Sequence, residues 1–152
     1  MNSLFHFLFN YIVVSLIFGQ KPELIPIVAF FSIMLDLDHL PYVIKNFRSV
    51  LRYLRFGSVS RTRSHELFGL AIVSSIILFI SFFYRNLIIL QIILLCIILH
   101  YTIDFLIGHS RPFNPYSKQE VFLRFYSTLK QRVLIEMTST IIAVIVFWLM
   151  IF

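Results

Sequence analysis

Charged residues are scarce in this chain of 152 residues: they make up 13% of it, whereas apolar residues make up 59%. A soluble domain typically carries about 25% charged residues, so this composition excludes an ordinary soluble protein and favours lipid as the solvent. The 18 phenylalanines, many of them inside apolar runs, suit the same surroundings. The formal charge of +6 forms no basic stripe on a soluble module, so we expect no nucleic-acid partner.

Cysteine and acidic residues are also rare. The single cysteine, Cys96, lies in the middle of an apolar run. It excludes an internal disulfide and any metal site built from several thiolates. Asp and Glu number only 7, and three of them are aspartates. Because acidic groups are so few, their positions are informative.

Five apolar segments predict an all-α integral membrane protein that forms a single transmembrane domain over residues 1–152. They are expected at about 3–18, 23–38, 66–84, 87–107 and 132–152. The last three have the roughly 20 residues that a hydrocarbon core about 30 Å thick requires. The first two are shorter, which leaves a re-entrant pair or a thin local bilayer open. Helices are expected because backbone amides in lipid must find partners within their own segment.

The basic residues predict an orientation. Of the 13, six lie between the second and third segments and five between the fourth and fifth or at the start of the fifth. The other two connections hold only Lys21 and only Arg85. Since loops rich in Lys and Arg stay in the cytoplasm, we expect a multi-pass protein of the inner (cytoplasmic) membrane with a cytoplasmic N-terminus. Residues 42–63 carry apolar positions at helical spacing beside arginines, which favours an amphipathic helix on the inner leaflet over a solvated linker.

Ionisable residues gather at one end of the predicted spans. Such groups are costly within a membrane, and they indicate a functional site. The candidates on the cytoplasmic side are His6, Asp36, Asp38, His39, His65, His100 and Asp104, with Glu136 near the start of the last span. His100 and Asp104 are four residues apart, so they share one helical face. Imidazole with carboxylate favours zinc, manganese or iron, and the number of candidates allows one or two ions.

Plainer interpretations exist for each of these residues. His6 alone fits an interfacial polar residue, and His100 with Asp104 fits a buried His–carboxylate pair. Glu136 fits a partner of Arg132, four residues before it. A structural polar cluster, or a metal or proton carrier, also uses such side chains. A carrier, however, needs polar groups through the whole bilayer, and the third and fourth spans offer few.

The order of these residues resembles a known family, the membrane-bound, metal-dependent hydrolases typified by the bacterial inner-membrane protein YdjM. That family carries an N-terminal His, a D-x-D-H box, a basic segment ending in H-R-x-x-[ST]-H, and an H-x-x-x-D pair followed by Gly and Pro. The matching residues here are His6, Asp36-Leu37-Asp38-His39, Arg61-Thr62-Arg63-Ser64-His65, and His100 with Asp104, Gly108 and Pro112. The chain departs from the family at Ser60, where the first His of the third box is usual. It also departs at Glu66, where a small hydroxyl residue is common.

The resemblance implies a metal-dependent hydrolase, and the position of the candidates suggests a lipid-like substrate. We expect cleavage of an ester or phosphoester at the cytoplasmic leaflet, with one or two ions, zinc first, as Lewis acid and activator of water. Asp38 or Glu66 is the expected general base. Arg61 and Arg63 are expected to hold a phosphate or to act only as topology charges. Glu136 is a candidate for supporting the ligands. The sequence does not indicate an oligomeric state.

Overall fold

A computed structural model describes residues 2–39, 44, 66–84, 87–107, 111–113, 116, 117, 119, 121, 126 and 128–152, without the side chains of Asp38, His39 and Leu129. This part of the chain is helical and contains no β-strand, as predicted. Its elements are α1 (Ser3–Phe18), η1 (Pro22–Leu24), α2 (Ile25–Ile33), η2 (Met34–His39), α4 (Leu67–Ser81), α5 (Leu87–Ile107) and α6 (Leu129–Ile151). The amphipathic helix predicted at 42–63 lies outside the described residues, apart from position 44.

Local sequence signals set the ends of α1 and the start of α6. The side chain of Asn2 caps α1 by accepting a hydrogen bond from a main-chain N–H in the first turn at 2.8 Å. α1 ends at Gly19, whose φ of +85° is a conformation that favours glycine. α6 begins with a capping box, in which the Thr128 hydroxyl and the Gln131 side chain each accept from the other residue's backbone N–H.

The second apolar segment differs from the prediction of one helix over residues 23–38. It divides into the short 3-10 turn η1, the nine-residue helix α2 and the 3-10 helix η2. Pro22 is the first residue of η1 and Pro26 the second residue of α2, positions where the missing N–H is tolerated. Pro41 follows η2 in the sequence, and a residue before proline is disfavoured in an α-helix. The segment therefore tightens into a 3-10 helix before it ends.

The other predicted segments agree with the structure to different degrees. α1 and α5 have the bounds expected from residues 3–18 and 87–107. α4 ends at Ser81, before the predicted residue 84, and the Ser81 hydroxyl donates to the main-chain oxygen of Leu78 at 2.6 Å. A side-chain bond to the preceding turn competes with continuation of the helix. α6 begins three residues early because of its capping box.

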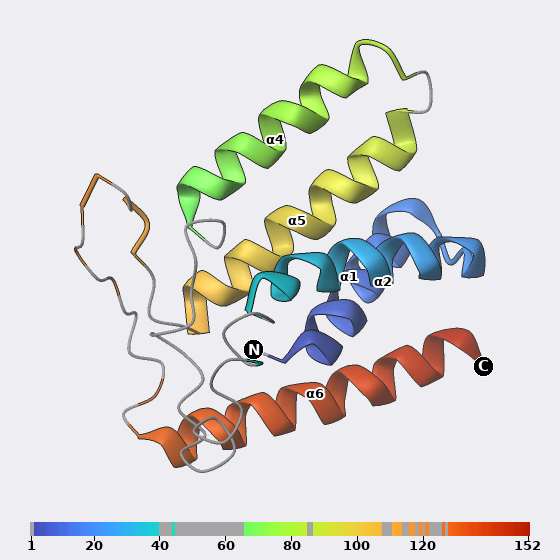
Figure 1. The fold of residues 1–152 in the computed structure, drawn as a ribbon. Helices are drawn as coiled ribbons and strands as arrows, with labels where there is room; N and C mark the ends of the chain where they lie inside the picture. The colour runs from blue at the N-terminus through green and yellow to red at the C-terminus, as the bar shows by residue number, and fades with distance from the viewer. Residues whose placement is uncertain are drawn as a thin grey trace.

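The helices form a bundle around α1 and α5 (Figure 1). α1 packs against α2, α5 and α6, while α4 packs only against α5 among the larger contacts. The starts of α4 and α6 and the end of α5 lie toward the left of Figure 1, and the start of α1 and the end of η2 lie nearer its centre. Among the candidates with described side chains, His6, Asp36, His100 and Asp104 come from these ends and lie close together.

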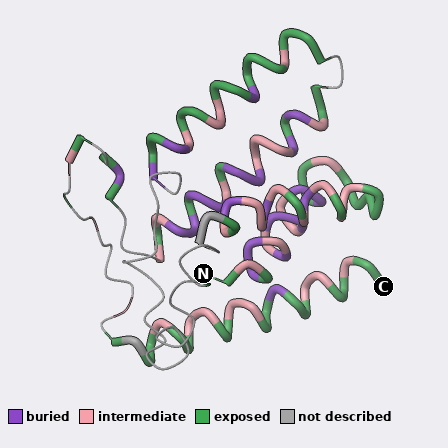
Figure 2. Tube along the Cα trace, in the orientation of Figure 1, coloured by how far each residue is buried: buried purple, intermediate pink, exposed green. Residues whose placement is uncertain are grey.

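Burial is concentrated where α1, α2 and α5 meet (Figure 2). Tyr11, Val28 and Ile92 of the three helices are at most 2% exposed and belong to one core cluster. The outer faces of α4 and α6 carry exposed apolar side chains instead, such as Phe79 and Leu149, at 66% and 74%. Contiguous exposed apolar surface indicates contact with lipid or a partner rather than with water.

Two of the described helices are long and apolar enough to cross a membrane, Leu87–Ile107 and Lys130–Ile151. α1 and α4 are apolar but shorter, at 16 and 15 residues. Length and composition therefore indicate a membrane protein, although weakly with two such helices. The predicted count of five spans rests on the sequence pattern.

Asn10 joins the three central helices through polar contacts. It is fully buried on α1, and its Nδ2 donates to Ser32 Oγ of α2 at 2.8 Å and to the main-chain oxygen of Cys96 on α5 at 3.0 Å. A buried acceptor left without its donor loses free energy, because neither water nor protein replaces the lost bond.

Substituting Asn10 should therefore destabilise the bundle. We expect Asn10→Ala to lower the free energy of unfolding by about 1–3 kcal/mol. Thermal unfolding in detergent, followed by circular dichroism, measures the change. The control is Gln91→Ala, which removes an exposed amide from α5 and should leave stability nearly unchanged. Equal effects of the two substitutions would contradict the role of Asn10.

Candidate metal centre

Three apolar helices each carry a polar stripe, and the three stripes face one another. On α1 the stripe consists of Ser3, His6 and Asn10, three and four residues apart. On α2 and η2 it consists of Ser32 and Asp36, and on α5 of His100 and Asp104. Spacings of three and four residues place side chains on one helical face. Because the surroundings are apolar, these groups find their polar partners in one another.

The centre of this arrangement is a group of two histidines and one aspartate. His6 of α1, Asp36 of η2 and His100 of α5 each offer a ligand atom within 4.8 Å of the other two. Both histidines are completely buried, whereas Asp36 is partly buried. His6 and His100, which are 94 positions apart in the chain, are thus brought together. Three of the predicted ligands, from three separate segments, thus form a group that could hold a metal ion.

Asp104 lies beside both histidines. Its Oδ1 is 3.2 Å from His6 Nε2, and its Oδ2 is 3.9 Å from His100 Nε2. Asp36 Oδ1 is 3.5 Å from the same His100 nitrogen. Two ligand atoms that each lie about 2.1 Å from a tetrahedral zinc ion are separated by about 3.4 Å. The observed separations are therefore close to those of ligands that share one ion.

Hydrogen bonding fixes which nitrogen of His100 faces this group. His100 Nδ1 lies 2.8 Å from the main-chain oxygen of Ser32. A carbonyl oxygen can only accept, so Nδ1 carries the proton and a neutral ring keeps its lone pair on Nε2. That nitrogen is the one next to Asp36 and Asp104. A second hydrogen bond that orients the ring in this way is usual for histidines that bind metals.

His6 is held by packing rather than by hydrogen bonds. Its ring stacks on that of His100, with centroids 3.8 Å apart and planes 17° from parallel. Neither ring nitrogen has a hydrogen-bond partner within the described part of the chain, although Nε2 is 3.2 Å from Asp104. A buried polar group without a hydrogen bond is uncommon and calls for an explanation. A ligand role for His6 supplies one.

Asp36 is positioned from α1. The hydroxyl of Ser3 donates to Asp36 Oδ2, which leaves Oδ1 directed at His100 Nε2. Ser3 is three residues before His6, so one face of α1 contributes both a ligand candidate and the group that orients another. Oriented carboxylates with a hydrogen-bonded outer oxygen are typical of metal sites.

Of the remaining candidates, Glu66 and Glu136 have described side chains and the others do not. The side chains of Asp38 and His39, and all of His65, Arg61 and Arg63, lie outside the described residues. Glu66 is described: it is 3% exposed, directly precedes α4, and its Oε1 accepts a hydrogen bond from the main-chain N–H of Arg111 at 2.9 Å.

Glu136 pairs with Arg132, the residue four positions before it. Its Oε1 accepts from Arg132 Nε at 3.1 Å, and both side chains are about one-fifth exposed. This is the i,i+4 pair considered above as the plainer interpretation. The proposed role of Glu136 in supporting the ligands stays a prediction.

Sequence reasoning missed Ser3, Asn10 and Ser32. Each was hidden because serine and asparagine are common near helix ends and carry no charge. A signal did exist, since Ser3, His6 and Asn10 are spaced by three and four residues on one face of an otherwise apolar helix.

Comparisons with protein-family models, with curated proteins and with solved structures found no match. The resemblance to membrane-bound hydrolases therefore rests on the motifs alone, and function has to be argued from the geometry.

The contact of Glu66 leads to a prediction on local stability. Substituting Glu66→Ala removes the acceptor of the Arg111 amide, so exchange of that amide hydrogen should accelerate by about tenfold, as expected for a bond worth roughly 1–1.5 kcal/mol. Glu66→Gln keeps a carbonyl oxygen and is the matched control, with little acceleration. Hydrogen-exchange mass spectrometry measures both. Equal acceleration in the two variants would show that the carboxylate charge, not the acceptor, orders residue 111.

Proposed function

We propose that the chain is a membrane-embedded, metal-dependent hydrolase that cleaves an ester or phosphoester of an amphiphilic, lipid-like substrate. The observation that carries the proposal is the convergence of His6, Asp36 and His100, from three helices, with ligand atoms within 4.8 Å of one another. The ligands are nitrogen and oxygen, which suits zinc and also manganese or iron. The ligand separations fit a single ion.

His6, Asp36 and His100 would hold the ion, with Asp104 beside both histidines. A metal bound by imidazole and carboxylate supplies Lewis acidity and a water of lowered pKa. The protein's own part is to keep the ligands oriented. Ser32 holds the His100 ring by its Nδ1, and the Ser3 hydroxyl holds one oxygen of Asp36. Such outer contacts preserve ligand geometry when a substrate enters.

The roles of the other candidates remain part of the proposal. Asp38 or Glu66 is the proposed proton acceptor, and Arg61 and Arg63 are the proposed phosphate-binding residues. His39 and His65 are proposed as further ligands in the case of a second ion. Glu66 is buried directly before α4, where its Oε1 already accepts a hydrogen bond from the Arg111 amide.

The location of the reaction follows from topology. Two helices long and apolar enough to span a bilayer, together with the exposed apolar faces of α4 and α6, support a membrane site. We further propose five spans with the N-terminus in the cytoplasm, based on the distribution of basic residues. The His–Asp group then lies near the cytoplasmic leaflet, where lipid head groups begin.

The contacts within the His–Asp group also allow a second interpretation, in which the group only joins helices. The pairs His6–Asp104 and His100–Asp36 join three helices, so a purely structural polar cluster is an alternative, as is a metal carrier. A structural cluster requires the histidines for folding but not for metal binding. Metal content and fold, measured on the same variants, separate the two functions.

Metal binding is a direct test of the proposed ion site. Detergent-purified protein incubated with zinc and then desalted should retain close to one ion per chain, measured by elemental mass spectrometry. His6→Ala and His100→Ala should retain much less, because each removes a ligand from a group of three. Asp36→Asn is a near-isosteric third variant with the same expected loss. Glu136→Gln, which alters the pair with Arg132 and none of the three ligand candidates, is the control and should retain the ion.

Circular dichroism on these samples decides between the alternatives. Folded variants without metal support the site. Wild-type protein that stays metal-free after incubation with zinc, manganese and iron would overturn the hydrolase and leave the structural cluster. Zinc should also raise the unfolding temperature of the wild type, since a ligand that binds the native state stabilises it, but not that of Asp36→Asn.

The orientation of the chain in the membrane is tested separately. Single cysteines introduced as Arg85→Cys and Lys118→Cys should react differently with a membrane-impermeant maleimide in intact bacterial cells. Residue 85 is expected outside and labelled at once, whereas residue 118 is expected to be labelled only after permeabilisation. Cys96 is fully buried and should contribute no background, so the native chain is its own control. The reverse pattern would contradict the proposed cytoplasmic side of the site.

A further inference from the structure

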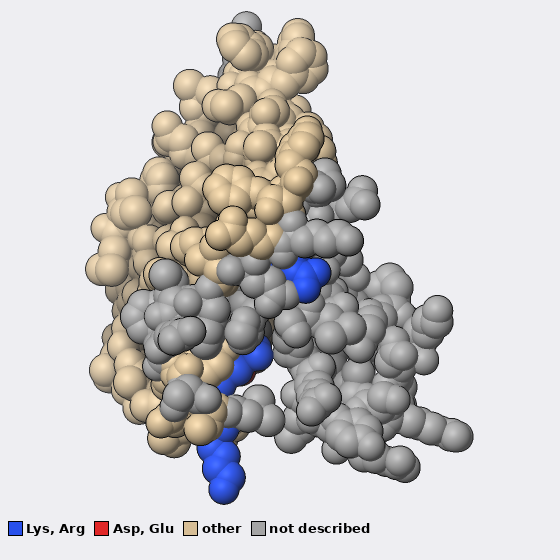
Figure 3. Space-filling model, turned by 90° about the vertical axis from the view of Figure 1, so that its left-hand side faces the viewer, with Lys and Arg blue, Asp and Glu red and all other residues tan. Residues whose placement is uncertain are grey.

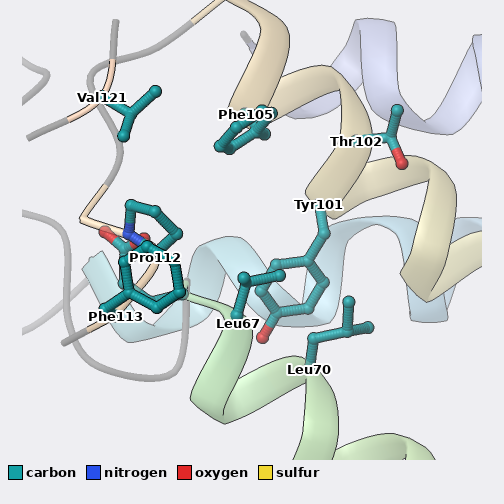
Figure 4. Close-up of a pocket in the computed structure, with 9 residues that line it drawn as sticks. Leu67, Leu70, Tyr101, Thr102, Phe105, Pro112, Phe113 and Val121 are labelled. Carbon is teal, nitrogen blue, oxygen red and sulfur yellow. The ribbon is translucent and has the colours of Figure 1, made fainter. Parts of the chain in front are cut away.

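A cavity of about 420 Å³ lies between the start of α4, the last turns of α5 and residues 112, 113 and 121. Figure 4 shows the side chains of Leu67 and Leu70 of α4, Tyr101 and Phe105 of α5, and Phe113 around it. Its size falls within the roughly 300–1,000 Å³ typical of small-molecule sites. It is distinct from the His–Asp group, none of whose members line it.

The walls of this cavity are chemically suited to a hydrocarbon. Most of its lining is aliphatic or aromatic, and the polar lining residues are Glu66, Tyr101 and Thr102. Glu66 is buried and engaged with the Arg111 amide. Apolar cavities bind ligands through burial of apolar surface, while a few polar groups set orientation. A sugar or a nucleotide would leave its hydroxyls without partners in such a place.

The cavity adjoins the candidate metal centre through α5. Tyr101 lines the cavity and directly follows His100, and the two rings meet edge to face with centroids 6.5 Å apart. Successive residues of an α-helix are turned by about 100°. Tyr101 and Phe105 therefore form a row on the side of α5 that lines the cavity. The row of His100 and Asp104 runs next to it along the same helix.

Positive charge lies on the same face of the molecule. Figure 3 shows basic side chains on the face formed by the start of α4, the end of α5 and the start of α6. Arg111, next to the cavity-lining Pro112, and Lys130 at the start of α6 are exposed. Cations beside an apolar cavity complement an amphiphile that has an anionic head and an apolar tail.

We propose that this cavity binds the fatty acyl chain of an anionic amphiphile. The proposal rests on the proposed function and specifies its substrate: the chain occupies the cavity between α4 and α5, and the polar end lies toward the His–Asp group. The surrounding exposed apolar faces allow the chain to enter from the lipid phase.

The test uses palmitate with a photoreactive diazirine at the end of its chain, added to the purified full-length protein in detergent. Mass spectrometry of the peptides locates the label. We expect it on the cavity-lining residues of α4 and α5, and we expect Leu67→Trp to reduce it by about tenfold because the indole occupies the space. Leu78→Trp is the matched control on α4: Leu67 and Leu78 are similarly exposed, at 48% and 56%, and only Leu67 lines the cavity.

Competition tests the charge of the head. Unlabelled palmitate should displace the probe at a lower concentration than hexadecanol, which has the same chain without the carboxylate; equal competition would overturn the anionic head. Label spread evenly over α4 and α6, or unaffected by Leu67→Trp, would overturn the cavity as the acyl site. Metal content is measured on the same samples. Cavity labelling in a protein that never binds metal would remove the hydrolase and retain the acyl site, so the two failures are distinguishable.

Discussion

The cost of burying imidazole and carboxylate groups among apolar helices determines how α1, α2 and α5 pack. His6 and His100 have no exposed surface, and Asp104 has 6%. Such groups lose their hydration on folding and must find polar partners inside the protein. The partners are available in one register only, with His6 against Asp104 and His100 against Asp36. A shift of one helix by a turn would separate them, so the polar stripes specify an arrangement that uniform apolar packing would leave open.

Further polar contacts, one turn along the helices from the His–Asp group, hold α1, α2 and α5 in this register. Asn10 links α1 to Ser32 and to the backbone of α5, and the main chain of Ser32 in turn accepts from His100. The histidine is thus held by a residue that is itself fixed by another helix. Sites whose ligands are supported in this way keep their geometry. α4 and α6 lie outside this network, and their exposed apolar faces suit the surroundings of the bundle, which the composition indicates to be lipid.

The sequence predicted the long regular elements and the pairings within a helix, but not the contacts across helices. The bounds of α5 followed from an uninterrupted apolar run, and the Glu136–Arg132 pair was anticipated as an alternative because i,i+4 spacing is local. The break of the second segment into η1, α2 and η2 was missed, since its hydrophobicity hid the effect of Pro26. The roles of Ser3 and Ser32 depend on which helices touch, and the periodicity of a single helix contains no such information.

The geometry of His6 favours a group that could hold a metal ion over a polar network that only joins helices. In a structural network every buried donor and acceptor should be hydrogen-bonded, because a partly satisfied network is less stable than an apolar core. His100 meets this requirement at Nδ1 through Ser32 but not at Nε2, and neither nitrogen of His6 has a hydrogen bond within the described residues. Its ring is nevertheless fixed by stacking on His100, with Nε2 toward the carboxylates. An imidazole held in place but left without a hydrogen bond is accounted for if its lone pair binds an ion. The structural alternative leaves that buried nitrogen unexplained.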